Sequence, residues 1–168
     1  MKLGSVLLVV DMQLGAFDGR RCEPMPDGPA LMARCRALVS EARAQGQQVI
    51  WVQHAGGAGG AMDREGPGFA IDPRLEPQPN ELVLVKTRPS AFDGTGLAVL
   101  LKGAERVRVV GLQSDVCIEA TALAGHALGL PMAVVGDGHH TWPTAGFSAE
   151  AVRDAVNGRL AAAGVRVD

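Results

Sequence analysis

The sequence predicts a three-layer α/β fold, in which a parallel sheet is covered by helices on both faces. Short apolar runs of strand length alternate along the chain with longer segments of helical pattern. The apolar runs are continuous rather than interrupted by polar residues, which is typical of strands buried on both faces. At 168 residues the chain is long enough for a real hydrophobic core, and we expect a single domain over residues 1–168.

The first half of the chain contains three predicted strands and one predicted helix. Residues 6–10 are five consecutive apolar residues and form the first strand. Residues 30–45 are predicted to be a helix, because residues of the inner face recur at near-helical spacing and Gly46 ends the pattern. The second and third predicted strands are 48–53 and 82–85.

The second half of the chain continues the alternation of helices and strands. The expected elements are a helix over 95–102, a strand over 107–110, a helix over 118–128, a strand over 132–135, a last helix that ends near Ala162, and a short strand over 165–167. Gly129 and Pro131 end the helix before the fifth strand. Ser148 is predicted to cap the last helix, because its hydroxyl can accept a hydrogen bond from the first turn.

Composition and charge exclude several classes of protein. The net charge is -2 and the basic residues are scattered, so we expect no nucleic-acid partner and no membrane partner. The three cysteines are widely spaced and odd in number, which favours a reducing compartment over a disulfide framework. No apolar stretch approaches the length of a membrane span. The sequence therefore predicts a cytoplasmic protein.

Residues of complementary chemistry follow three of the predicted strands. Asp11 follows the first strand, Lys86 follows the third, and Cys117 lies between the fourth strand and the next helix. In parallel sheets ligands collect at the carboxyl ends of the strands. A thiol at a helix N-terminus feels the positive end of the helix dipole, so we expect the thiolate to be favoured. A nucleophile, a carboxylate and an ammonium group at such an edge predict a hydrolytic site.

Each of these residues also has a purely structural interpretation. Cys117 alone could be a small buried hydrophobe, as free cysteines often are. Asp11 could cap a neighbouring turn, and Lys86 could point to water from a strand end. Cys22 and Cys35 are interpreted as structural or incidental, because Cys35 lies in a helical pattern and Cys22 in a charged loop.

Three segments of the chain resemble the signatures of the isochorismatase-like cysteine hydrolases, a group that includes nicotinamidases and N-carbamoylsarcosine amidohydrolases. The segments are 7–13 (LLVVDMQ), 85–92 (VKTRPSAF) and 111–121 (GLQSDVCIEAT). The resemblance runs in order across nearly the whole chain. It implies a Rossmann-like fold with a six-stranded parallel sheet, a catalytic triad, and assembly as a homodimer or homotetramer. The triad residues would be Asp11, Lys86 and Cys117.

The same resemblance implies the chemistry around the nucleophile. It implies a cis peptide bond between Leu112 and Gln113, which turns the backbone amides of Gln113 and Cys117 toward one point as an oxyanion hole. The implied reaction is hydrolysis of a small carboxamide or related acyl compound through a thioacyl intermediate. Asp11 would act as general base, while Lys86 stabilises the charged pair.

Two departures from the family narrow this expectation. Nicotinamidases place an Asp-x-His metal cluster after the second strand, whereas this chain has Gln53 and His54 there without the carboxylate. We therefore expect no metal and no other cofactor. Isochorismatases proper lack a cysteine at the position of Cys117, so hydrolysis of a vinyl ether is also disfavoured.

Several further residues are candidates for the substrate pocket or its supports. The pocket candidates are Gln13, Phe17, His54, Phe92, His140 and Trp142. Ser114 and Asp115 are expected to cap the helix that carries Cys117. Residues 55–80 are rich in Gly and Pro and are predicted to be a surface excursion that forms a lid or an interface loop.

Two other classes of function stay open from the sequence. In the first, the fold is kept but Cys117 serves redox sensing, or the pocket only binds a ligand. In the second, the chain is a structural subunit of a larger assembly, with residues 55–80 as its contact surface.

Overall fold

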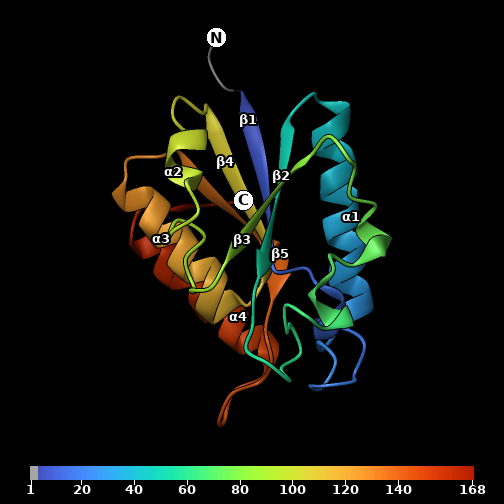
Figure 1. Cartoon of the computed structure of the whole chain (residues 1–168). Coiled ribbons are helices and arrows are strands. Elements are labelled where there is room, and N and C mark those ends of the chain that lie inside the picture. Colours follow the sequence, from blue (N-terminus) through green and yellow to red (C-terminus); the bar gives the residue numbers. More distant parts are fainter. Residues whose placement is uncertain (1–3) are drawn as a thin grey trace.

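The continuous apolar runs form the strands of one sheet in the computed structural model, which describes residues 4–168 (Figure 1). The strands are β1 (Ser5–Val10), β2 (Gln48–His54), β3 (Leu82–Lys86), β4 (Arg106–Leu112), β5 (Met132–His140) and β6 (Arg166–Val167). Their order is β3-β2-β1-β4-β5-β6, and each neighbouring pair is parallel. The predicted α/β fold with a six-stranded parallel sheet is therefore confirmed.

Helices cover both faces of this sheet (Figure 1). The α-helices are α1 (Gly28–Ala44), α2 (Leu97–Leu100), α3 (Glu119–Ala127) and α4 (Ala149–Ala162). Short 3-10 turns lie at Leu14–Ala16, Pro67–Phe69 and Pro73–Leu75, and a π-helical turn at Ser114–Ile118 leads into α3. Within residues 4–168, no helix combines the length and the apolarity needed to cross a bilayer.

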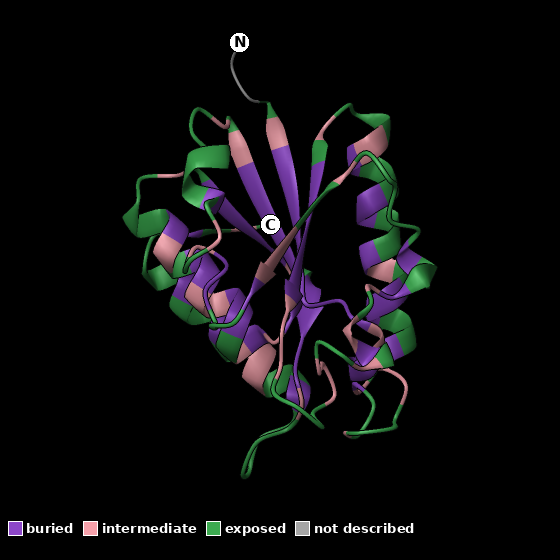
Figure 2. Cartoon of the chain, viewed as in Figure 1, coloured by how far each residue is buried: buried purple, intermediate pink, exposed green. Residues whose placement is uncertain are grey.

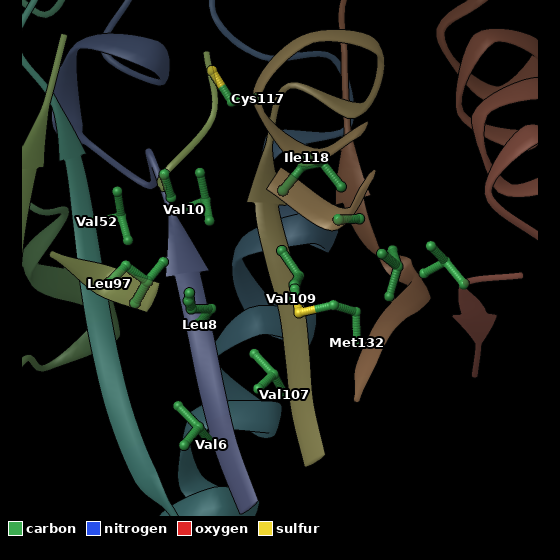
Figure 3. Close-up of a cluster of buried hydrophobic side chains, with 14 of the residues drawn as sticks. Val6, Leu8, Val10, Val52, Leu97, Val107, Val109, Cys117, Ile118 and Met132 are labelled. Atoms are coloured by element: carbon green, nitrogen blue, oxygen red, sulfur yellow. The ribbon is translucent and has the colours of Figure 1, made fainter. Parts of the chain in front are cut away.

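Two apolar clusters, one on each face, hold the layers together. Because side chains of a strand alternate between faces, Leu8 of β1 packs under α2, α3 and α4, whereas Leu7 packs under α1. Figure 3 shows the first cluster, in which β1 and β4 side chains meet Leu97 of α2 and Ile118 at the start of α3. Figure 2 shows the consequence: the central strands are buried along most of their length, and the helices are buried on their inner sides.

Two of the predicted elements differ clearly in length from the observed ones. The predicted helix over 95–102 is a single turn, because Gly96 and Gly103 have positive φ angles that flank it. The predicted strand over 132–135 continues to His140. A shift in register between Val109 and Gly111 accommodates this extension beside β4. The extension of β5 beyond Val135 is rich in Gly and has no apolar run, so the sequence did not predict it as a strand. Ser148, as predicted, accepts a hydrogen bond from the backbone N–H of Ala151.

The strand order creates a crevice at the carboxyl ends of β1 and β4. The chain moves from β1 outward to β3 in one direction, and from β4 outward to β6 in the other. Connections therefore leave these two neighbouring strands on opposite sides, and a ligand can enter between them. The three residues of the predicted hydrolytic site lie at this edge: Asp11 follows β1, Lys86 ends β3 and Cys117 follows β4.

Gly111 of β4 packs directly against the backbone of Val10 in β1, so this position should not accept a larger residue. It has a φ angle of 121°, and an added Cβ would lie 2.0 Å from the carbonyl oxygen of Val10. Gly111→Ala should lower the free energy of unfolding by about 3 kcal/mol or more, through backbone strain and displacement of β1. Chemical denaturation of the purified variant measures this loss.

Gly158 provides the matched control for that substitution. It lies inside α4 with no atom within 4 Å of an added Cβ. Gly158→Ala should therefore raise the free energy of unfolding by about 0.5–1 kcal/mol, because alanine is the better helix former. Equal effects of the two substitutions would contradict the packing described for the β1–β4 pair.

Candidate active site

Asp11 is held in an uncommon backbone conformation directly after β1. Its φ angle is 55°, in the left-handed region that Asp tolerates better than most residues. Its backbone N–H donates to the carbonyl of Val52 at 2.8 Å, and its carbonyl accepts from the N–H of Gln13 at 2.8 Å. These bonds turn the carboxylate away from the strand direction and fix it, buried, at the crevice.

Lys86 is the last residue of β3, at the far edge of the sheet, and its long side chain reaches back across β2. Its Nζ lies 3.0 Å from Asp11 Oδ2 and 3.1 Å from Cys117 Sγ. It also donates to the carbonyl of Arg88 at 3.1 Å and lies 3.2 Å from His54 Nδ1. The side chain is fully buried, so the paired carboxylate and the other acceptors compensate for the loss of hydration.

Cys117 lies in the π-helical turn that follows β4. The peptide bond between Leu112 and Gln113, just before this turn, is cis. The carbonyl of Gln113 accepts from the backbone N–H groups of Val116 and Ile118 at 3.2 and 3.0 Å. The turn therefore begins at Gln113 and presents the Cys117 thiol, which is 8% exposed, to Asp11 and Lys86.

The electrostatics of the site favour a thiol rather than a thiolate in the free protein. Burial and the neighbouring Asp11 carboxylate raise the pKa of Cys117 to about 12, against the opposing effect of the Lys86 ammonium. Burial also raises the pKa of Asp11, again opposed by Lys86. The expectation of a favoured thiolate is therefore wrong for the free protein, because burial and the Asp11 carboxylate both favour the thiol.

A cavity of about 600 Å³ opens beside these residues, and Asp11 and Cys117 form part of its wall. Most of the remaining wall is apolar, from side chains that include Ala16, Ala61, Met62, Leu112, Val116 and Trp142. Residues of the Gly-rich segment 55–80 thus line the cavity directly. The cavity is large enough for a small organic molecule with an apolar part.

Of the six pocket candidates, His54 and Trp142 line this cavity. His54 lies at the end of β2 in register with Lys86, so its ring sits beside the ammonium group. Burial and the charge of Lys86 lower the pKa of His54, which keeps the ring neutral. Trp142 follows β5, and its indole N–H donates to the carbonyl of Glu23 at 3.0 Å.

The structure places the other four pocket candidates outside this cavity. Gln13 is buried and supports His54: its side-chain amide donates to the carbonyl of His54 at 3.0 Å and accepts from its N–H at 2.7 Å. Phe17 packs on the α1 face of the sheet, and Phe92 on the opposite face. His140 lines a separate cavity near the start of α1. Packing in the layers and the extension of β5 account for these differences.

The expected caps of the helix that carries Cys117 are also wrong. The Ser114 hydroxyl lies 2.7 Å from His139 Nδ1, and the Asp115 carboxylate accepts from the Thr141 hydroxyl at 2.6 Å. Both side chains therefore bind the end of β5 instead of the backbone N–H groups of the helix. They connect the turn that carries Cys117 to the end of β5, a part of the strand that the sequence did not predict.

Cys22 and Glu23 are among the residues of the cavity wall that the sequence did not predict. Cys22 and Glu23 lie in the loop after β1 and reach the cavity. The Cys22 thiol donates to the carbonyl of Gly15 at 3.3 Å. Their sequence neighbourhood is charged and irregular, and it gives no local signal for a pocket. The contacts of Cys22 with Gly15 and of Glu23 with Trp142, far along the chain, hold this loop at the site.

Comparisons with known proteins identify a family model and several relatives that match this chain. The model of the isochorismatase domain matches residues 5–167. Two streptothricin hydrolases from Streptomyces noursei are each 33% identical over 159 residues and 92% of this chain. This chain spans only 57% and 62% of their lengths. The ureidoacrylate amidohydrolase RutB from an Enterobacter strain is 28% identical over 81% of this chain and 75% of its own.

A solved structure agrees with the family match. An isochorismatase-family protein from Chromobacterium violaceum superposes with a TM-score of 0.88 and 29% sequence identity, over 98% of this chain and 89% of that one. The similarity covers the sheet, both helical layers and the segments at the carboxyl ends of the strands.

Asp11 and Lys86 have opposite effects on the pKa of the Cys117 thiol, and alkylation rates test both effects. Asp11→Asn removes the negative neighbour, so the pKa of Cys117 should fall and iodoacetamide should label it faster at neutral pH, by about tenfold per unit of pKa. Lys86→Met removes the positive neighbour and should slow the labelling. Peptide mass spectrometry gives the rate at each cysteine.

Cys35 serves as the internal control for these rates. It is fully buried on the inner side of α1, and burial raises the pKa of its thiol to about 12. Its labelling should be equally slow in all three proteins. Rapid labelling of wild-type Cys117 below about pH 7, or slower labelling in Asp11→Asn, would contradict the electrostatics described here.

Proposed function

Because this chain belongs to the isochorismatase family, we propose that it is a cysteine-dependent hydrolase of a small carboxamide or related acyl compound. The observation that carries the proposal is the meeting of three groups at the cavity: the Lys86 ammonium lies 3.0 Å from the Asp11 carboxylate and 3.1 Å from the Cys117 thiol. The amidohydrolase among the relatives supports a C–N bond as the target.

The first proposed step transfers a proton from Cys117 to Asp11. One Asp11 oxygen, Oδ2, is held by Lys86, whereas Oδ1 is buried without a hydrogen-bond partner among the described residues. Oδ1 is therefore the free acceptor for the proton. The transfer turns a carboxylate and a thiol into a carboxylic acid and a thiolate, so the total charge of the site is unchanged. The raised pKa of Asp11 makes it a stronger base than an ordinary aspartate.

In the second step the thiolate attacks the carbonyl carbon of the substrate. The backbone N–H groups of Gln113 and Cys117 would bind the developing oxyanion. The C–N bond then breaks, Asp11 returns its proton to the leaving ammonia or amine, and a thioester remains on Cys117. Asp11 next takes a proton from water, and the resulting hydroxide attacks the thioester. The acid product leaves and the thiol is restored by the proton that Asp11 holds.

His54 is proposed to bind the substrate rather than to transfer protons. Its Nδ1 faces the Lys86 ammonium and accepts from it, so the proton of the neutral ring lies on Nε2. This leaves Nε2–H as a donor for a polar group of the substrate. The apolar wall beside it, with Met62 and Trp142, suits a substrate whose acyl or amine part is apolar.

The redox-sensing alternative has less support from the same geometry. Redox-sensor cysteines are exposed and have a low pKa, because the thiolate is the form that oxidants attack. Cys117 is buried, and its pKa is raised to about 12. The cytoplasmic location and the assembly as a homodimer or homotetramer stay predictions from the sequence.

Removal of the nucleophile tests the proposed reaction. A screen of small amides, read by release of ammonia or amine, first identifies a substrate of the wild-type protein. Cys117→Ala should then lower the turnover by at least about 10⁴-fold, as loss of a nucleophile does in other hydrolases. Cys22→Ala is the matched control, since Cys22 lines the same cavity but lies outside the triad. Full activity of Cys117→Ala would exclude the mechanism.

The pH dependence of the reaction tests the role of Asp11. Asp11 accepts a proton only when it is ionised, so kcat/KM falls as pH decreases through its pKa. Burial raises this pKa above 3.8, and the acid limb should therefore lie above about pH 4. Initial rates between about pH 4 and 9 measure the limb, with circular dichroism as the control for folding. An acid limb at or below the ordinary pKa of aspartate would overturn the assignment.

A further inference from the structure

His140, at the end of β5, is a buried side chain without partners. It is 4% exposed, and neither ring nitrogen has a hydrogen-bond partner among the described residues. Such a group is costly, because it loses its bonds to water and gains none from the protein. The ring lines a cavity of about 310 Å³ that is separate from the catalytic cavity. An unpartnered imidazole at a cavity wall indicates a ligand for its lone pair.

Two carboxylates lie next to this ring from elements far apart in sequence. Asp27 precedes α1 and Glu150 lies in the first turn of α4. His140 Nε2 is 3.8 Å from Asp27 Oδ2, which is too long for a hydrogen bond. One ligand atom of each of the three residues lies within 4.8 Å of the other two. Asp27 occupies the N-cap position of α1, and its side chain makes no capping bond to the helix.

These separations suit a metal ion between the three groups. Zinc binds imidazole nitrogen and carboxylate oxygen at about 2.0–2.2 Å, so two ligands of one tetrahedral ion lie about 3.4 Å apart. The distance of 3.8 Å between His140 Nε2 and Asp27 Oδ2 is only slightly longer, so a small movement of the Asp27 side chain would bring both atoms to one ion. Glu150 is exposed and free to adjust, whereas His140 is fixed by its strand.

The charges around the site also favour a cation. The Asp27, Glu150 and Asp154 carboxylates act on the His140 ring, against the single opposing charge of Arg153. The arginines of this cavity are not free to bind an anion, because each is engaged with a carboxylate. The two ion pairs are Arg34–Asp137 and Arg153–Asp154, each at 2.9 Å.

We propose that His140, Asp27 and Glu150 form a binding site for one divalent transition-metal cation of the Zn²⁺ type. Water would complete its coordination. The ion would join the start of α1, the end of β5 and the start of α4, which adjoin the catalytic crevice. The site differs from the Asp-x-His cluster of nicotinamidases, because it lies on β5 and not after β2. Its role is structural, since none of its ligands lines the catalytic cavity.

Zinc binding to purified variants tests this proposal. Equilibrium dialysis of the full chain against micromolar Zn²⁺, followed by metal analysis, gives the stoichiometry for the wild type, His140→Gln, Glu150→Gln and Cys117→Ala. We expect one Zn²⁺ per chain in the wild type and in Cys117→Ala, and at least a tenfold weaker affinity in the other two. His126→Gln is the matched control, because His126 is an exposed histidine on α3.

Thermal unfolding gives a readout that is independent of dialysis. At a free Zn²⁺ concentration of about 100 times Kd, the Tm of the wild type should rise by about 5–10 °C, and that of His140→Gln should not. If His140→Gln does not fold, the exposed Glu150→Gln variant carries the comparison. Zinc lost in Cys117→Ala but kept in His140→Gln and Glu150→Gln would assign the ion to the active-site thiol and overturn the proposal. Absence of binding to the wild type would overturn it as well.

Discussion

The candidate active site is organised around the contacts of the buried Lys86 ammonium group. It comes from the edge strand β3, yet it contacts Asp11 after β1 and Cys117 after β4. A single cation therefore ties together three segments that are separate in sequence. A buried lysine without a partner would tend to lose its charge, because the loss of hydration favours the neutral form. The carboxylate, the Arg88 carbonyl and the His54 ring around it are thus requirements of its burial as well as parts of the site.

The sheet explains how this arrangement is reached. All six strands are parallel, so their carboxyl ends share one edge, and β1 and β4 are neighbours whose connections leave in opposite directions. Asp11 turns into the crevice through its left-handed backbone conformation. Lys86 needs its long side chain, because β2 lies between β3 and β1. The length of each side chain therefore matches the distance from the end of its strand to the crevice.

Sequence patterns predicted the parts of this structure that depend on local chemistry. The run Val6–Val10 predicted β1 because continuous burial requires continuous apolar residues, and Ser148 predicted the start of α4 through its hydroxyl. The catalytic triad remains a prediction from strand ends and family resemblance, now with short distances in its support. What the patterns missed depends on contacts between distant segments. The end of β5 has no apolar signal, and its pairing with β4 moves His140 out of the catalytic cavity.

The charge of the site explains why a raised thiol pKa is compatible with catalysis. With Cys117 as a thiol, the Asp11 carboxylate and the Lys86 ammonium balance each other, and this neutral set is the form that burial tolerates best. A free thiolate would add a net negative charge to the buried site, which is why the pKa of Cys117 rises to about 12. Transfer of the proton to Asp11 avoids that charge, because the acid and the thiolate together carry the same charge as the carboxylate and the thiol. In the proposed reaction the nucleophile therefore forms only together with protonated Asp11, and the proton for the leaving amine would already be in place when the thiolate attacks.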